Sequence, residues 1–197
     1  MVRHFYNDNK TTNDLLDNIE ISLTSYSDAE NILEILCKTF EIPSFEDALM
    51  QLVITNVDLN NSIKAYDKRD NKIYGILLLG HFDINRGSPL QRVNPFLAKL
   101  FKTFNQLNGH SFVIDERLRG CGLDKKILNK SLEYFKQYDI IWCGVEHELN
   151  THNYWKRLGF VELFSNHNAK FYAKSFDKNI MLEILILKLL HHEKNIY

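Results

Sequence analysis

The chain has 197 residues and carries 24 Lys and Arg against 25 Asp and Glu, which gives a formal net charge of −1 at pH 7. This length suits one globular domain with a full hydrophobic core. The balanced charge provides no global attraction for nucleic acid or an anionic membrane, so we expect neither as a partner.

The cysteine content and the N-terminus narrow the class of protein further. Cys37, Cys121 and Cys143 are too few and too scattered for a disulfide framework or a zinc site, so we expect no metal. The N-terminus is polar, and no apolar stretch is long enough to span a bilayer. We therefore expect a cytoplasmic protein with a mobile polar arm at 1–16 and a single domain at 17–197.

The first half of the chain predicts helices between strands. The expected elements are a strand at 20–23, a helix that begins at Ser27 and ends at Pro43, a helix at 45–54, and a hairpin of strands at 62–66 and 72–82. The run at 76–79 is apolar without alternation, which indicates a strand buried on both faces in the centre of a sheet.

The second half alternates helices and strands. We expect a helix at about 90–107, strands at 111–114 and 140–145 with a helix between them, a helix at 151–158, a strand at 160–164, a strand or loop at 170–176, and a last strand at 181–190. This order predicts an α/β (α+β) fold with a mixed, mainly antiparallel central sheet flanked by helices. The last strand would offer an edge for pairing, so a monomer or a homodimer is expected.

A basic, glycine-containing turn follows the strand at 111–114 and opens directly into a helix. Its glycines are Gly120 and Gly122, and basic residues surround them at Arg117, Arg119, Lys125 and Lys126. Glycine allows positive φ and close approach of a ligand to the main chain. Free amides and the helix dipole favour an anion at such a helix start, so the turn predicts a phosphate site.

Two common phosphate motifs do not fit this turn. A P-loop needs Gly-Lys-Ser/Thr, and the dinucleotide fingerprint needs a third glycine; neither is present. The turn instead resembles the coenzyme A loop of the GNAT acyltransferases, Arg/Gln-x-x-Gly-x-Gly/Ala. Two registers are open: one begins at Arg117 and the other at Arg119. The second has the better strand-to-helix spacing and places Asp124 where the family usually has Gly or Ala.

A second segment strengthens the resemblance to the GNAT family. Residues 150–160 run from Asn150 through Tyr154 and Trp155 to Gly159-Phe160, and this is similar to the family's Asn, short helix with Tyr, and Gly-Phe. The resemblance covers about 62–164 best. It implies a GNAT fold with an extra helix, at about 90–107, between the third and fourth strands.

The resemblance also implies a coenzyme site. The strand at 112–114 would pair with the pantetheine arm of acetyl-CoA, the turn at 119–125 would hold the pyrophosphate, and Asn150 and Trp155 would flank the thioester. The implied coenzyme-binding residues are Phe112, Val113, Ile114, Arg119, Gly120, Cys121, Gly122, Leu123, Asp124, Lys125, Asn150 and Trp155. The implied reaction is direct attack of an amine on the thioester carbonyl, which needs a base, an oxyanion donor and a proton for the thiolate.

Three residues are candidates for the chemistry. His110 precedes Ile114 by four residues, so the alternation of a strand places it on the same face as Phe112 and Ile114. A neutral imidazole suits a base at pH 7, so His110 is the candidate for that role. Trp155 stands where the family usually has a Tyr that acts as the general acid. Three alternatives follow: Tyr154 is the acid, solvent protonates the thiolate, or the protein only binds acyl-CoA. Glu146, after the fifth strand, would orient a cationic amine.

The resemblance therefore implies an N-acetyltransferase that moves an acetyl group from acetyl-CoA to a small-molecule or peptide amine. Two alternatives remain open. One is a non-catalytic acyl-CoA-binding or regulatory module on the same fold, favoured by Trp155 and Asp124. The other is an unrelated nucleotide-binding α/β enzyme that uses the same turn.

Overall fold

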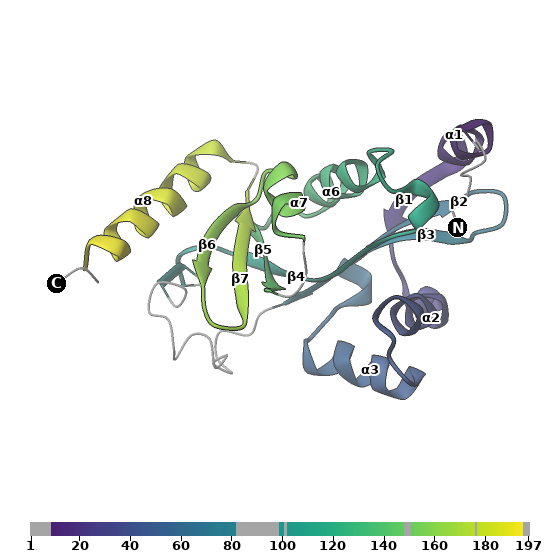
Figure 1. Ribbon diagram of the computed structural model, residues 1–197, viewed down its shortest axis with the longest axis horizontal. Coiled ribbons are helices and arrows are strands. Elements are labelled where there is room, and N and C mark those ends of the chain that lie inside the picture. The colour runs from purple at the N-terminus through teal and green to yellow at the C-terminus, as the bar shows by residue number, and fades with distance from the viewer. Residues whose placement is uncertain (1–8, 82–98, 101, 148–150, 176, 195–197) are drawn as a thin grey trace, which may run out of the picture.

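The structure, a computed structural model, describes residues 9–81, 99–100, 102–147, 151–175 and 177–194, with only the backbone described at 9–11, 81 and 190–194. Seven strands form one sheet in the order β1-β2-β3-β4-β5-β7-β6 (Figure 1). Every neighbouring pair is antiparallel except β4 and β5, which are parallel. The mixed, mainly antiparallel sheet predicted from the sequence is confirmed.

The strands and helices alternate along the chain much as the sequence indicates. The strands are β1 Ile19–Leu23, β2 Ile63–Asp67, β3 Ile73–His81, β4 Gln106–Ile114, β5 Ile140–Glu146, β6 Val161–Ser165 and β7 Ala169–Lys174. The helices are α1 Asn9–Asn18, α2 Ala29–Phe40, α3 Phe45–Ile54, α6 Leu123–Tyr134, α7 His152–Arg157 and α8 Lys178–Lys194, with short 3-10 turns at Tyr26–Asp28, Leu59–Asn61 and Glu116–Leu118. No helix in the described ranges is long and apolar enough to cross a membrane.

Helices cover both faces of the sheet, as Figure 1 shows, with α6 and α7 above it and α2 and α3 below. Ile127 and Leu128 of α6 pack with Leu77, Leu107 and other residues of one face. Side chains of α2 and α3 pack against the opposite face of β3 and β4. The sheet is thus packed on both faces: one hydrophobic core lies under α6, and a second lies under α2 and α3.

Two predictions at the ends of the chain are wrong. The arm expected at 1–16 is helical from Asn9 onward, and Leu15 and Leu16 of α1 pack against the core. The strand expected at 181–190 is part of α8, whose Ile184 is fully buried and whose Ile180 and Leu187 are partly buried at helical spacing. Further leucines and isoleucines on the exposed side of α8 hide this period in the sequence, and the pairing edge proposed for a homodimer is not a strand.

The predicted boundary between the extra helix and the fourth strand also shifts. Most of the helix expected at 90–107 lies outside the described residues, although residues 99, 100, 102 and 103 are helical. The strand β4 begins at Gln106, five residues before the predicted strand at 111–114. Its first half contains polar residues and a glycine, so it lacks the apolar pattern that marks a strand.

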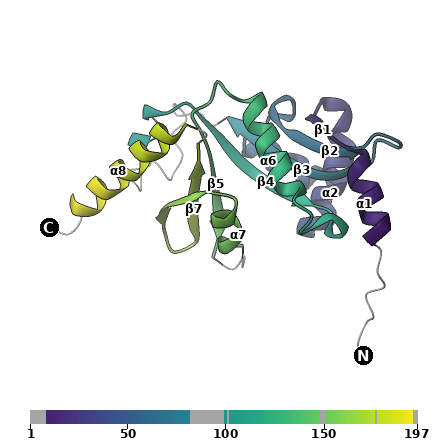
Figure 2. The ribbon, with the colours of Figure 1, turned by 90° about the horizontal axis from the view of Figure 1, so that it is seen from above.

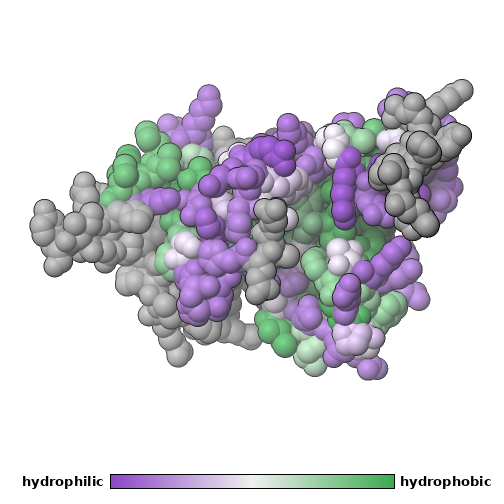
Figure 3. All heavy atoms as spheres, in the orientation of Figure 1, coloured by the Kyte–Doolittle hydropathy of each residue, from purple (hydrophilic) through white to green (hydrophobic). Residues whose placement is uncertain are grey.

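Apolar side chains remain exposed on two separate helices, α8 at the left of the view and α3 at the bottom (Figure 3). Those of α3 are Phe45, Leu49, Met50, Val53 and Ile54, and those of α8 are Leu182, Leu185, Ile186 and Leu189. The two faces lie far apart and away from the predicted phosphate turn, so they do not shape that site.

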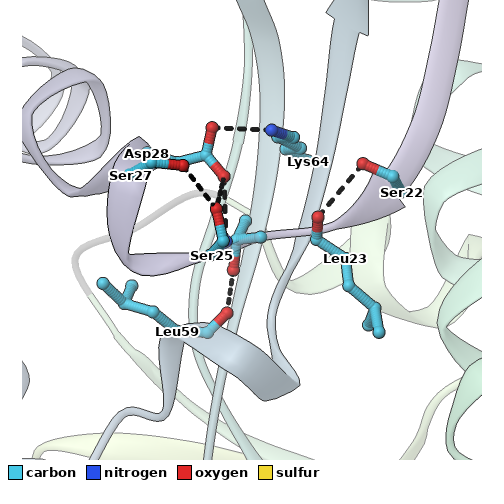
Figure 4. Close-up of polar contacts among 8 residues, drawn as sticks. Ser22, Leu23, Ser25, Ser27, Asp28, Leu59 and Lys64 are labelled. Carbon is cyan, nitrogen blue, oxygen red and sulfur yellow. Dashed lines mark hydrogen bonds and ion pairs between the residues drawn. The ribbon is translucent and has the colours of Figure 1, made fainter.

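The start of α2 is fixed to the sheet by a buried carboxylate (Figure 4). Asp28 accepts hydrogen bonds from the Ser25 backbone N–H at 2.8 Å and from Lys64 Nζ on β2 at 2.6 Å. Thr24 donates its hydroxyl to the carbonyl of Leu59 in the same junction. Burial raises the pKa of Asp28, but the bonds from Lys64 and Ser25 outweigh burial, so the pKa lies below its ordinary value.

We expect Asp28→Ala to lower the free energy of unfolding by roughly 2 to 3 kcal/mol at pH 7, because it leaves Lys64 half-enclosed without its partner. The lowered pKa means that the ionised carboxylate stabilises the fold above about pH 4 and loses this effect as the pH falls through the folded pKa. Urea unfolding at pH 7 and pH 3 would measure both. Glu30→Ala, which removes an exposed acid from the same helix, is the control, and an equal loss for both variants would contradict the prediction.

Candidate functional site

The site begins where two central strands part. The parallel pairing of β4 with β5 covers only Gln106↔Ile140, Leu107↔Ile141 and Asn108↔Trp142. Beyond this point β4 continues alongside β3, and β5 continues alongside β7. The two strands therefore diverge (Figure 2), and the edges that face each other carry backbone groups that their ladder does not use.

A β-bulge lies at the start of this opening. Ser111 pairs with Leu78 and Gly109 pairs with Leu79, so His110 is an extra residue on β4. A bulged residue is left out of the ladder, and the bulge re-aims the neighbouring side chains. Strict alternation therefore does not hold through His110, although His110 and Phe112 line the same cavity.

His110 and its neighbour form a polar pair inside the opening. The His110 Nδ1 and the Ser111 Oγ lie 2.8 Å apart. Burial lowers the pKa of His110 below its ordinary value, so the imidazole is neutral at pH 7 and available as a base. Sequence reasoning did not select Ser111, and the only available signal was its position beside His110.

The glycine turn lies at the far end of β4. Gly120 and Gly122 have φ of +80° and +77°, and no atom lies within 4 Å of a Cβ added to either. The helix α6 begins at Leu123, directly after Gly122, which agrees with the register that starts at Arg119. A glycine backbone with open space beside it can admit a ligand to the first amides of the helix.

Some basic side chains around the turn are paired with other groups of the protein, whereas others are exposed to solvent. Arg117 makes two hydrogen bonds of 2.9 Å to Asp115 and lies over the ring of Tyr74. The hydrogen bonds from Arg117 hold the pKa of Asp115 below its usual range. Arg119 donates to the carbonyl of Ile114 at 3.2 Å, and Lys125 and its neighbour Lys126 are exposed. The free positive charge thus lies close to the two glycines.

Aromatic side chains fill most of the opening between the strands. The ring centroid of Phe112 on β4 lies 6.4 Å from Tyr154 and 6.1 Å from Trp155, both on α7. Trp155 also lies edge-on to Phe160 at 5.0 Å. The remaining cavity has a volume of about 30 Å³, and its lining includes His110, Phe112 and Trp155.

The structure brings some predicted residues together and leaves others apart. His110, Phe112 and Trp155 line one cavity, and Tyr154 contacts Phe112 from α7. Val113 points to the opposite face, where it packs with α2 and α3. Glu146 is exposed at the end of β5 and does not line that cavity. Asn150 lies outside the described residues.

The cysteines differ in their surroundings. Cys121 is exposed in the turn, whereas Cys143 is buried on β5 and lines the small cavity. Burial raises the pKa of the Cys143 thiol, which therefore stays protonated at neutral pH. Within the described residues there is no group of three or more His, Cys, Asp or Glu side chains arranged to hold a metal ion.

Solved structures with the same arrangement include N-acetyltransferases, although the sequence matches no protein-family model and no curated protein. The mosquito arylalkylamine N-acetyltransferase like 5b has a TM-score of 0.58 at 14% identity, over 80% of this chain and 100% of that chain. A GNAT family N-acetyltransferase of Escherichia coli (YhbS), in complex with CoA, has a TM-score of 0.56 at 17% identity, over 83% and 84%.

A third similar structure is NAA60 of Arabidopsis thaliana in complex with a bisubstrate analogue, with a TM-score of 0.55 at 14% identity, over 80% of this chain and 97% of that chain. At identities this low the likeness shows the fold. The chain has the fold of the GNAT N-acetyltransferases, as its two sequence motifs predict.

Proposed function

We propose that the protein transfers an acetyl group from acetyl-CoA to a primary amine. The observation that carries the proposal is the opening between β4 and β5, where the half-buried, neutral imidazole of His110 lies on β4 and an open glycine turn follows the end of the same strand. The GNAT fold supports it, and one structure of this fold is described in complex with CoA.

The residues of the opening suit the coenzyme. The edge of β4 at 112–114 would hold the pantetheine arm through its backbone, and the first amides of α6 would hold the pyrophosphate. The turn, with Arg119, Gly120, Cys121 and Gly122, lets the ligand approach the main chain, while Lys125 adds positive charge. Acetyl-CoA, when bound, supplies the activated thioester.

The chemistry needs few protein groups. His110 accepts a proton from the amine as the nitrogen attacks the thioester carbonyl, the C–S bond breaks, and the thiolate leaves. A backbone N–H freed from the ladder by the bulge would donate to the developing oxyanion. The thiolate then takes a proton from Tyr154 or from solvent. Burial, followed by the charge of Asp124, raises the pKa of Tyr154, so its hydroxyl keeps its proton at neutral pH.

The acceptor would approach the end of β5. Glu146 is exposed there, and a carboxylate in this place would orient a cationic amine, whether it belongs to a small molecule or a peptide. Proteins of this fold include an arylalkylamine N-acetyltransferase and a Drosophila melanogaster polyamine N-acetyltransferase, which are named for small amines.

A second candidate function is non-catalytic binding of acyl-CoA. It is favoured by the aromatic filling of the opening and by Trp155, whose indole packs against Phe160 and supplies no useful acid. Calorimetric titration with acetyl-CoA, followed by an assay of amine-dependent CoA release, separates the two. Binding with turnover supports the transferase, binding without turnover of any amine supports the second candidate, and no binding to a folded sample rejects both.

We expect Gly122→Val to weaken coenzyme A binding by at least about a hundredfold, because a β-branched residue is strained at φ +77° and its side chain would occupy the space beside the first amides of α6. The dissociation constant from calorimetry checks this. Asn71→Val, which places the same β-branched residue at a φ of +60° in the exposed turn between β2 and β3, is the control. Unchanged affinity in Gly122→Val would remove the turn from the coenzyme site.

We expect His110→Ala to lower kcat by about a hundredfold at pH 7, the scale of a lost general base. The lowered pKa of His110 predicts that the wild-type rate falls only below about pH 6.5, where the imidazole gains a proton, and that the variant loses this limb of the profile. His167→Ala, which changes an exposed histidine in the turn between β6 and β7, is the control. A variant that retains the acidic limb would show that His110 is not the base.

A further inference from the structure

The helix α7 is joined to the strand β7 by a hydrogen bond at its start. The Nδ1 of His152, the first residue of α7, lies 3.1 Å from the hydroxyl oxygen of Tyr172, which is fully buried on β7. The Nε2 of the same ring is buried and has no hydrogen-bond partner among the described residues. The hydroxyl of Tyr172 is therefore the polar group that fixes this imidazole, and with it the first turn of α7.

A second contact from β7 reaches the end of the same helix. Lys174 donates a hydrogen bond from Nζ to the carbonyl of Leu158, the residue that follows α7. The same Nζ lies 6.0 Å from the centroid of the Phe160 ring. A cation at the last carbonyls of a helix also interacts favourably with the helix dipole. A Cβ added at Gly159 would lie 3.3 Å from Lys174 Nζ, so the missing side chain gives the amine room.

The two contacts come from one face of one strand. Tyr172 and Lys174 are two residues apart on β7, so their side chains point to the same face of the sheet. None of the six residues of α7 is buried, so burial alone anchors this helix weakly, and the two polar contacts fix both of its ends. Because β7 pairs with β5 and not with β4, α7 is attached to the β5 side of the opening.

The position of α7 matters because its aromatic residues face β4. Tyr154 and Trp155 lie against Phe112. Trp155 also lines the small cavity together with His110. The edge of β4 and the glycine turn, which would bind the coenzyme, lie on the other side of the opening. One side thus carries the proposed binding groups, and the other carries an aromatic wall and the candidate acid, Tyr154.

We propose that Tyr172 and Lys174 are positioning residues that hold α7 in place from β7. Through them, Tyr154 and Trp155 keep a fixed place relative to His110. This inference rests on the proposed function, because it assigns the fixed geometry to acetyl transfer. A small displacement of groups around two reacting substrates lowers the rate. Loosening α7 therefore slows turnover, while the turn and the edge of β4 still bind the coenzyme.

Hydrogen exchange tests the attachment without any ligand. We expect Lys174→Met, which keeps an unbranched chain, and Tyr172→Phe, which keeps the ring, each to speed amide exchange at 152–160 about tenfold. Exchange in α6 should stay at the wild-type rate. Lys174→Arg, which keeps the charge and the donors, should exchange like the wild type. Lys170→Met is the matched control, because it removes another lysine of β7, one that lies 3.6 Å from Glu162.

Kinetics tests the positioning. We expect Lys174→Met and Tyr172→Phe to lower kcat for acetyl transfer about tenfold and to leave the dissociation constant for CoA within about twofold of the wild-type value. Lys174→Arg and Lys170→Met should keep the wild-type kcat. A loss of folded protein would lower the binding stoichiometry in calorimetry together with the rate. An unchanged stoichiometry therefore separates positioning from destabilisation of the fold.

The outcomes separate this inference from the proposed function. Faster exchange in α7, together with a lower kcat at unchanged CoA affinity, supports it. Unchanged exchange, unchanged kcat, or a weakening of CoA binding that accounts for the loss of rate overturns it. If the wild type acetylates no amine, the proposed function fails and the positioning role fails with it, whereas the exchange rates still show whether β7 holds α7.

Discussion

The site depends on the short parallel contact between β4 and β5. Three residue pairs hold the two strands together, and beyond Asn108 and Trp142 each strand stays with its other neighbour. A longer ladder would use the backbone of β4 in hydrogen bonds and leave no edge for a ligand. Because the contact ends there, β4 is free of β5 from the bulge at His110 to its end at Ile114, and the glycine turn follows that end.

The parts of this site that could be predicted from the sequence are those set by neighbouring residues. The strand end at Ile114, two glycines with basic neighbours and a helix from Leu123 follow one another within ten residues, so local pattern suffices. The hairpin of β2 and β3 was predicted for the same reason. His110 lies half-buried in the same cavity as Phe112, and its role as the base stays a prediction.

The parts that could not be predicted depend on contacts between distant segments. The bulge at His110 arises from the pairing of β4 with Leu78 and Leu79, and no residue pattern within β4 predicts it. The first half of β4 is polar and is a strand only because β3 and β5 supply its hydrogen bonds. In α8 the exposed leucines add apolar residues outside the helical period, so the sequence pattern wrongly predicts a strand. The structure shows the helical period because Ile184 lies in the core.

The two helices that border the opening, α6 and α7, differ in how firmly they are packed. The cavity between the strands has a volume of about 30 Å³, so a pantetheine arm bound there as proposed would require one side of the opening to move. The helix α6 is anchored by five buried residues, among them Ile127 and Leu128, whereas none of the six residues of α7 is buried. Displacing α7 therefore costs fewer contacts than displacing α6. If the opening widens for a ligand, we therefore expect the movement in α7, while α6 and the glycine turn before it stay in place.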